Sequence, residues 1–179
     1  TATPTTTNVS CNGGNNGTAT LNISGGTISS GNYLVDWFGE NTNSLSVGTY
    51  SYTVTDDIGC SDSGSVTITE PAVLTATHTS TNVSCNGGDD GTATVNISGG
   101  TQAYTAHAEF NNVWYAQSLG PGNSWTANNG LTAGNYPYFV SDANGCQTDT
   151  AIIIITQPSP IIVNELTTNV SCNGGNNGT

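Results

Sequence analysis

The sequence contains no lysine, no arginine and no methionine, and only 12 of its 179 residues are acidic, which gives a formal charge of −12. Without cations the chain can form no lysine or arginine salt bridge and no basic patch, so nucleic acids and anionic membranes are excluded as partners. Long apolar runs are also missing. The run Ala151–Ile155 has the length of a strand, so no membrane insertion is expected. No signal peptide is recognisable, and we expect a mature or internal segment of a longer protein.

Groups that carry catalysis are scarce. His78 and His107 are the only histidines. Alternation in the predicted strand Tyr104–Phe110 places His107 on the solvent side, opposite the face of Tyr104. No nucleophile elbow lies near His78, and no Cys or His stands at zinc-ligand spacing. The sequence therefore predicts a protein that is not an enzyme.

One seven-residue phrase, Asn-Val-Ser-Cys-Asn-Gly-Gly, occurs three times, at Asn8–Gly14, Asn82–Gly88 and Asn169–Gly175. Each copy continues into a short polar turn and Gly-Thr. The interval between copies is too long for one turn of a solenoid, so each unit is expected to be a small domain. The predicted division is a first repeat over residues 1–71 (repeat 1), a second over 72–158 (repeat 2), and the start of a third over 159–179.

Alternating runs of Thr, Val, Ile and Tyr predict about seven short strands in a repeat, with no helical periodicity. Such a pattern favours an all-β fold of tandem immunoglobulin-like sandwiches. Trp37 is the expected core anchor of repeat 1. The phrase Leu-x-x-Gly-x-Tyr ends at Tyr50 and again at Tyr136, and it predicts a tyrosine corner, in which the phenol bonds backbone upstream. The alternative for both is a plain surface tyrosine.

The five cysteines follow the repeats: each repeat opens with Ser-Cys-Asn-Gly-Gly and closes with Gly-Cys. We predict one disulfide within each repeat, Cys11–Cys60 and Cys85–Cys146, which leaves Cys172 to a partner outside the chain or in another subunit. The alternative is free buried thiols. A loop of the length between Cys11 and Cys60 contributes roughly 4 kcal/mol in the chain-entropy model. Disulfides imply an oxidising, extracellular setting.

Taken together, Ser-Cys-Asn-Gly-Gly-x-x-Gly-Thr-Ala-Thr-x-Asn-Ile-Ser-Gly-Gly, Leu-x-x-Gly-x-Tyr, Asp-x-x-Gly-Cys and Ile-Thr-x-Pro resemble the SprB-type repeat. The resemblance covers nearly the whole chain. It implies a giant cell-surface adhesin or filament of gliding Bacteroidota, exported by the type IX secretion system. One departure concerns the pattern Tyr-x-x-x-Trp, which holds at Tyr33 and Trp37 whereas repeat 2 has Tyr104 and Ala108.

Three further sets of residues are candidate sites. Calcium prefers the hard oxygens offered by Asn15, Asn16, Asp89 and Asp90 in glycine-rich turns, and the alternative is a solvated Asx turn. Asp149-Thr150-Ala151 resembles a Bacteroidota O-glycosylation signal, with Thr150 as acceptor. An insertion over residues 111–129 carries Trp114, Tyr115 and Trp125, which form a carbohydrate platform if they are exposed and coplanar. No cofactor other than calcium is expected.

Two classes of function follow. The first is a structural stalk or filament whose partners are further copies of the repeat, and the second is a module that binds surface polysaccharide. The apolar segment Ile161–Thr168 either begins a third repeat in a continuous string or completes the sandwich of a neighbouring subunit. The remaining Cys172 favours the continuous string.

Overall fold

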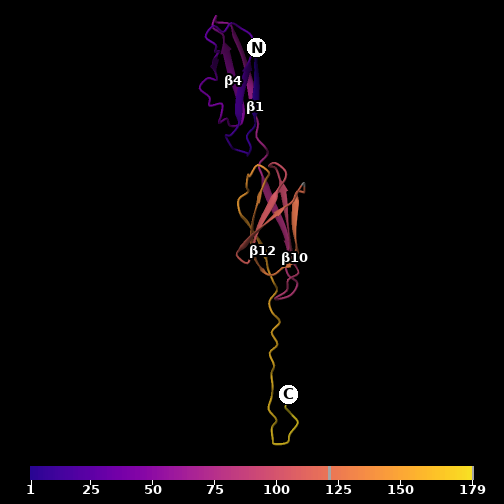
Figure 1. The fold of residues 1–179 in the computed structure, drawn as a ribbon. Helices are drawn as coiled ribbons and strands as arrows, with labels where there is room; N and C mark the ends of the chain where they lie inside the picture. The colour runs from indigo at the N-terminus through magenta and orange to yellow at the C-terminus, as the bar shows by residue number, and fades with distance from the viewer. Residues whose placement is uncertain (121, 179) are drawn as a thin grey trace.

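The computed structural model describes residues 1–120 and 122–178, so Thr179, in the turn after the third motif copy, lies outside the described residues, as does Pro121 in the insertion. Within the described residues every regular element is a strand, and none is a helix that could cross a membrane. Two sandwiches follow one another end to end, and an extended segment leads away from the second (Figure 1). The prediction of an all-β fold is confirmed.

Repeat 1 contains five strands in two antiparallel sheets. β1 (Ala2–Thr7) pairs with β2 (Thr18–Ile23), and β4 (Gly48–Thr55) lies between β3 (Leu34–Asp36) and β5 (Ser61–Ile68). Alternation decides which side chains face inward, because Tyr52 and Val54 of β4 are buried while Ser51 is exposed. Both sheets contribute to one hydrophobic core, whose buried members are Val9, Ala19, Leu45, Tyr52, Val54, Val66 and Ile68.

Repeat 2 has a sheet of three strands and a sheet of four. β7 (Gly91–Ser98) lies between β10 (Ser124–Leu131) and β6 (Thr75–Thr81). The other sheet has the order β12 (Ala151–Ile155), β11 (Gly134–Ser141), β8 (Thr105–Phe110) and β9 (Val113–Ser118). The insertion therefore forms β9 and most of β10, one edge strand on each sheet, which the sequence pattern did not resolve.

The core of repeat 2 is separate from that of repeat 1. Its buried members come from both sheets and from the motif: Val83, Ala93, Val95, Ile97, Tyr104, Ala108, Leu131, Tyr138, Val140, Ile153 and Ile155. Val9 and Val83, the second residues of the first two motif copies, occupy equivalent places in the two cores. Each repeat thus buries its own apolar side chains, which is the property of an independently folding unit.

The tyrosines of the Leu-x-x-Gly-x-Tyr phrase bond as a tyrosine corner requires. The Tyr50 hydroxyl donates to the Ser46 carbonyl at 3.0 Å, and the Tyr136 hydroxyl donates to the Thr132 carbonyl at 2.9 Å. Trp37 is only half-buried and packs its ring against Tyr52 at a centroid distance of 5.2 Å. It therefore covers the edge of the core rather than filling its centre.

The segment after β12 carries exposed apolar side chains. Ile161 is 94% exposed and Leu166 is 88% exposed. In repeat 2 the equivalent segment is packed, because Leu74, at the position equivalent to Ile161, contacts the core of repeat 2.

Candidate functional site: the junction between the repeats

The repeated motif folds into a loop that is closed by its own side chains. In the first copy the amide of Ser10 donates to the Asn16 side-chain oxygen at 3.0 Å, and the Asn16 amide nitrogen donates to the Ser10 hydroxyl at 2.6 Å. The Gly14 amide donates to the Cys11 carbonyl at 3.0 Å. Gly13 has a φ of 73°, in the left-handed region where glycine is favoured. These bonds fix the conformation of the loop that carries Cys11.

The same loop grips the segment by which its repeat ends. The Asn12 side chain donates to the Pro71 carbonyl at 3.1 Å, and the Gly13 amide donates to a Glu70 carboxylate oxygen at 2.6 Å. Repeat 2 reproduces both contacts, from Asn86 to the Pro158 carbonyl at 3.0 Å and from the Gly87 amide to the Gln157 side chain at 2.8 Å. The motif therefore fixes the direction in which the chain leaves each repeat.

The closing Gly-Cys lies in a turn that both repeats share, in which an aspartate side chain accepts hydrogen bonds from three backbone amides. Asp142 is buried, and its carboxylate accepts from the amides of Thr101 at 2.8 Å, Asn144 at 2.9 Å and Cys146 at 2.9 Å. In repeat 1 the carboxylate of Asp56 accepts from the equivalent amides, those of Thr27, Ile58 and Cys60. Bonds from Thr27 above all, with those from Cys60 and Ile58, hold the pKa of Asp56 below its ordinary value.

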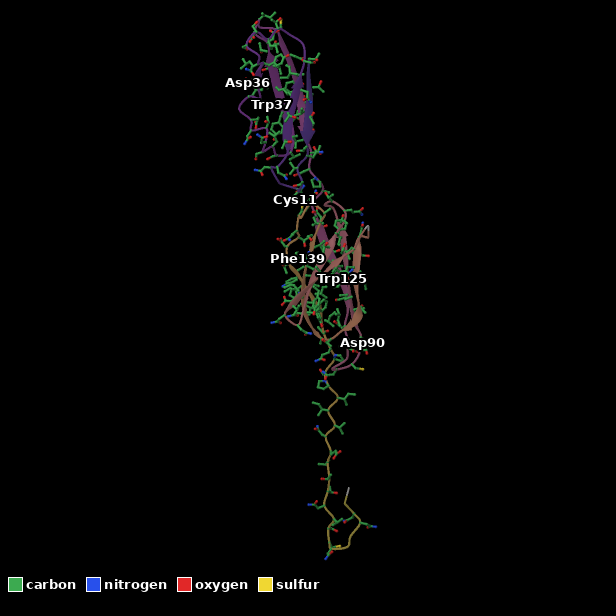
Figure 2. The ribbon with its side chains drawn as sticks, viewed as in Figure 1. Cys11, Asp36, Trp37, Asp90, Trp125 and Phe139 are labelled. Carbon is green, nitrogen blue, oxygen red and sulfur yellow. A yellow bond between two sulfur atoms is a disulfide. The ribbon has the colours of Figure 1, made fainter. Side chains whose placement is uncertain are left out.

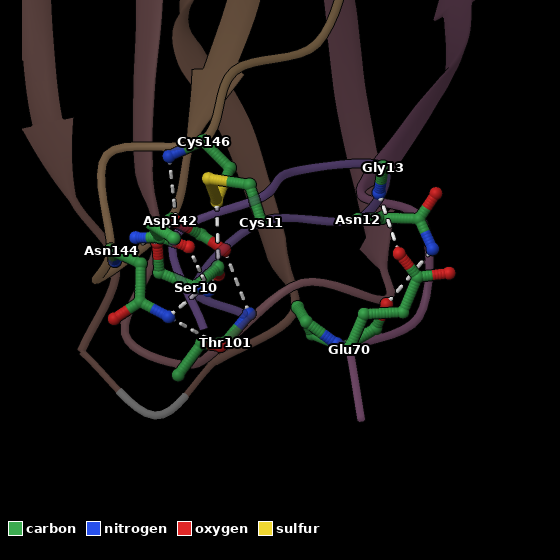
Figure 3. Close-up of a disulfide and its surroundings, with 11 residues drawn as sticks. Ser10, Cys11, Asn12, Gly13, Glu70, Thr101, Asp142, Asn144 and Cys146 are labelled. Atoms are coloured by element: carbon green, nitrogen blue, oxygen red, sulfur yellow. Dashed lines mark hydrogen bonds between the residues drawn. A yellow bond between two sulfur atoms is a disulfide. The ribbon is translucent and has the colours of Figure 1, made fainter. Parts of the chain in front are cut away.

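A disulfide joins these two geometries across the boundary between the repeats, because Cys11 of repeat 1 is bonded to Cys146 of repeat 2. Figure 3 shows the contacts that surround it. The Asn144 side chain donates to the Ser10 carbonyl at 2.9 Å and to the Thr101 hydroxyl at 3.1 Å. Cys11 and Cys146 are half-buried in this contact. The junction is thus closed by one covalent bond and by polar contacts from both repeats.

The predicted pairing within repeats is wrong. Cys60 precedes β5, whose far end is tied to the motif because the Val9 amide donates to the Thr69 carbonyl at 3.0 Å. Nine residues of extended chain separate Cys60 from Thr69, which is about 30 Å, whereas a disulfide needs Cα atoms within about 7 Å. Cys60, Cys85 and Cys172 are exposed free thiols. The predicted partner of Cys60 therefore lies at the opposite end of the same sandwich.

Of the four candidate calcium residues, two form hydrogen bonds that close the motif loop and the other two point to solvent. Asn16 closes the first loop, and Asp90 does the same in the second, where it accepts from the Ser84 amide at 2.9 Å. Hydrogen bonds from the Ser84 hydroxyl and amide lower the pKa of Asp90. Asn15 and Asp89 are exposed. Among the described residues no group of three or more His, Cys, Asp or Glu side chains is gathered for a metal ion.

The three aromatic residues of the insertion do not share one face. Tyr115 and Trp125 line a cleft of about 620 Å³ between β9 and β10, together with Phe110 and Tyr136. The Trp114 ring instead packs against Phe139 at 5.3 Å. Neighbours in a strand point to opposite faces, so Trp114 lies on the outer face of the sheet and Tyr115 on the face of the cleft.

The remaining predicted site residues lie apart from the junction. His107 is on the outer face as expected, although its ring is half-buried and stacks on Phe139 at 4.3 Å. His78 reaches the buried Tyr138 hydroxyl at 3.1 Å. Thr150 is exposed directly before β12. The His107 Nε2 lies 2.9 Å from the Ser141 Oγ, so this histidine also contacts a serine hydroxyl.

Sequence reasoning identified the two cysteines of the junction but not their pairing, and it assigned no role to Asp142 or to the Asn144 side chain. Figure 2 places Cys11 where the two sandwiches meet and Asp90 at the opposite end of repeat 2. The sequence did contain a sign that Cys11 and Cys60 lie far apart, namely the predicted strand between each closing cysteine and the proline at the end of its repeat. A full strand carries the chain from one end of a sandwich to the other.

Fold and junction together define a tandem array of small all-β domains that are linked end to end by a disulfide. Two stretches of the chain, residues 3–37 and 77–105, match the family model described as SprB repeat. Both stretches begin at equivalent positions in the first strand of their repeat and continue through the motif. In these two stretches the chain is similar to the SprB repeat, a repeat of the surface adhesin type. No curated protein matches the chain.

Proposed function

We propose that this chain is a stalk segment of an extracellular bacterial surface filament or adhesin, and that it spaces an adhesive or motility element from the cell. The observation that carries the proposal is the Cys11–Cys146 bond, because it ties two separately folded repeats at their ends. The SprB match supports a surface location, and a disulfide suits an oxidising compartment. Attachment and gliding are the roles we assign to the whole protein, with type IX export as its route.

Junction stiffness is the property that a stalk needs, and small-angle scattering measures it. The oxidised chain is compared with a variant carrying Cys11→Ser and Cys146→Ser. Because the two cores share no residues, both proteins keep their circular dichroism spectrum. The variant should show a broader distribution of interatomic distances, since only noncovalent contacts then restrain the two repeats. Identical scattering curves would contradict a stalk role for the bond. Antibody labelling of intact cells tests the surface location.

A second candidate function is carbohydrate binding in the cleft between β9 and β10. The cleft combines the aromatic rings of Tyr115 and Trp125 with Gln117 of β9, and its volume of about 620 Å³ suits a small saccharide. Neutral glycans are the class favoured, because a chain of charge −12 repels anionic polysaccharides.

A glycan array tests this candidate with a matched control. Trp125→Ala should abolish binding, whereas Trp114→Ala should leave it unchanged because Trp114 packs on the outer face. Equal loss in both variants, or no bound glycan with the parent chain, would count against the cleft. Calcium held near Asp89 and Asp90 and a glycan on Thr150 stay proposals, and mass determination of the native protein in buffer with and without chelator tests both.

A further inference from the structure

The three motif copies adopt one loop conformation, including the copy that has no sandwich around it. Asn177 bonds the Ser171 amide at 3.0 Å and the Ser171 hydroxyl at 2.9 Å, as Asn16 does with Ser10. The Gly175 amide donates to the Cys172 carbonyl at 2.9 Å. The loop is therefore encoded locally, and each copy presents its cysteine in the same way. Cys85 and Cys172 are presented as Cys11 is, but they are exposed.

The closing turn of repeat 1 likewise reproduces the half of the junction that repeat 2 supplies. Asp56 organises the turn around Cys60 through the same three amides that Asp142 bonds around Cys146. Ile58, which stands where repeat 2 has Asn144, is 68% exposed. An exposed isoleucine at this position offers an apolar contact in place of the bond from Asn144 to Ser10.

We propose that the free thiols are halves of further junctions of the same kind, so that the opening cysteine of each SprB-type repeat bonds the closing cysteine of the next repeat. By this rule Cys60 takes the opening cysteine of a repeat placed before repeat 1. Cys85 takes the closing cysteine of a repeat placed after repeat 2, and Cys172 that of the repeat beyond. The rule rests on the proposed stalk function and extends it to a continuous array.

Formation of each bond is a two-electron oxidation. Two thiols lose two protons and two electrons to a disulfide oxidant, which is converted into two thiols, and the new sulfur–sulfur bond forms by thiol–disulfide exchange. Because both thiols are exposed, the attacking thiolate can reach the oxidant in solution.

Successive bonds in such an array overlap along the chain. Each begins before the closing cysteine of its own repeat and ends beyond the opening cysteine of the next, as Cys11–Cys146 spans both Cys60 and Cys85. A pulling force can then pass from sulfur to sulfur and bypass most of the strands.

A tandem protein tests the pairing. Residues 1–161 are joined to a second full copy of residues 1–179, because Ile162 and Thr1 occupy equivalent positions before the motif. Cys60 of the first copy, and both Cys85 and Cys172 of the second copy, are changed to serine. The protein is refolded with oxidised and reduced glutathione, alkylated, and cleaved before aspartate, which puts the cysteines into separate peptides. We expect a peptide pair that joins Cys85 of the first copy to Cys60 of the second.

The control tandem carries Cys85→Ser in the first copy, and Cys60→Ser and Cys172→Ser in the second. The two thiols that remain then sit at the far ends of the array and should be alkylated. If Cys85 and Cys60 stay alkylated in the test tandem while Cys11–Cys146 forms in both copies, the pairing rule is overturned and the stalk proposal stands. If Cys11–Cys146 itself is absent from both copies, the stalk proposal fails as well.

Discussion

Pulling the chain by its ends gives the sharpest test of the junction, because the Cys11–Cys146 bond shortens the path that carries the force. The bond spans a sequence separation of 135 residues. At about 3.5 Å per residue this removes about 470 Å from the length that unfolding can release. Only the residues before Cys11 and after Cys146 remain extensible, which leaves about 150 Å.

The measurement is single-molecule force spectroscopy through terminal handles, in a background where Cys60, Cys85 and Cys172 are serine. With the bond intact, total extension should stop near 150 Å, and addition of reductant should lengthen it by about 470 Å. The same chain with Cys11→Ser should reach the full length with or without reductant. A bonded chain that still extends to the full length would refute the crossing disulfide, as a bond within repeat 1 would shield only about 170 Å.

Three smaller predictions follow from individual contacts. Gly91→Ala should destabilise repeat 2 by about 1–3 kcal/mol in chemical denaturation, because a Cβ there would lie 2.6 Å from the Leu131 carbonyl, while Gly134→Ala, with ordinary contacts, should stay within about 0.5 kcal/mol; equal effects would contradict the packing. Asp90→Asn should reduce the acid sensitivity of unfolding, because the lowered pKa of Asp90 contributes stability above pH 3.8 that is lost as the pH falls through the pKa of Asp90 in the folded protein. If the variant loses as much stability as the parent between pH 6 and about pH 2, the role of the Asp90 carboxylate is contradicted. Asn144→Ala should speed reduction of Cys11–Cys146 by dithiothreitol without changing the unfolding of either repeat, because it removes the bonds to Ser10 and Thr101; an unchanged reduction rate would show that these bonds do not hold the junction.

Much of the fold could be predicted from local pattern. Alternation around Val54 and Ile97 marks strands, and the tyrosine phrase predicts corners at Tyr50 and Tyr136 because the phenol reaches only four residues back. These features depend on neighbours within a few residues, which a sequence displays directly. The strands β9 and β10 were less accessible, since the edges of a sheet tolerate mixed side chains and the period-two signal weakens there.

Disulfide partners could not be predicted from spacing, because spacing does not say at which end of a sandwich a turn lies. Cys11 follows a strand that runs toward repeat 2, and Cys60 precedes a strand that runs the same way. The two therefore stand at opposite ends, although both belong to repeat 1. Direction of strands is a property of the sheet, and only the assembled sheet reveals it.

Crossing the boundary also places the covalent bond where the chain would otherwise be weakest. A bond within each repeat would reinforce two cores that already bury their own side chains, and it would leave the joining segment Thr69–Leu74 as the only tie between them. A chain without lysine or arginine has no salt bridges with which to stiffen that segment. The motif stiffens the segment with uncharged groups of its own. Asn12 and Gly13 donate hydrogen bonds to Pro71 and Glu70 where the chain leaves repeat 1, and Cys11 forms the disulfide with repeat 2. One short phrase thereby sets both the direction and the covalent strength of the array.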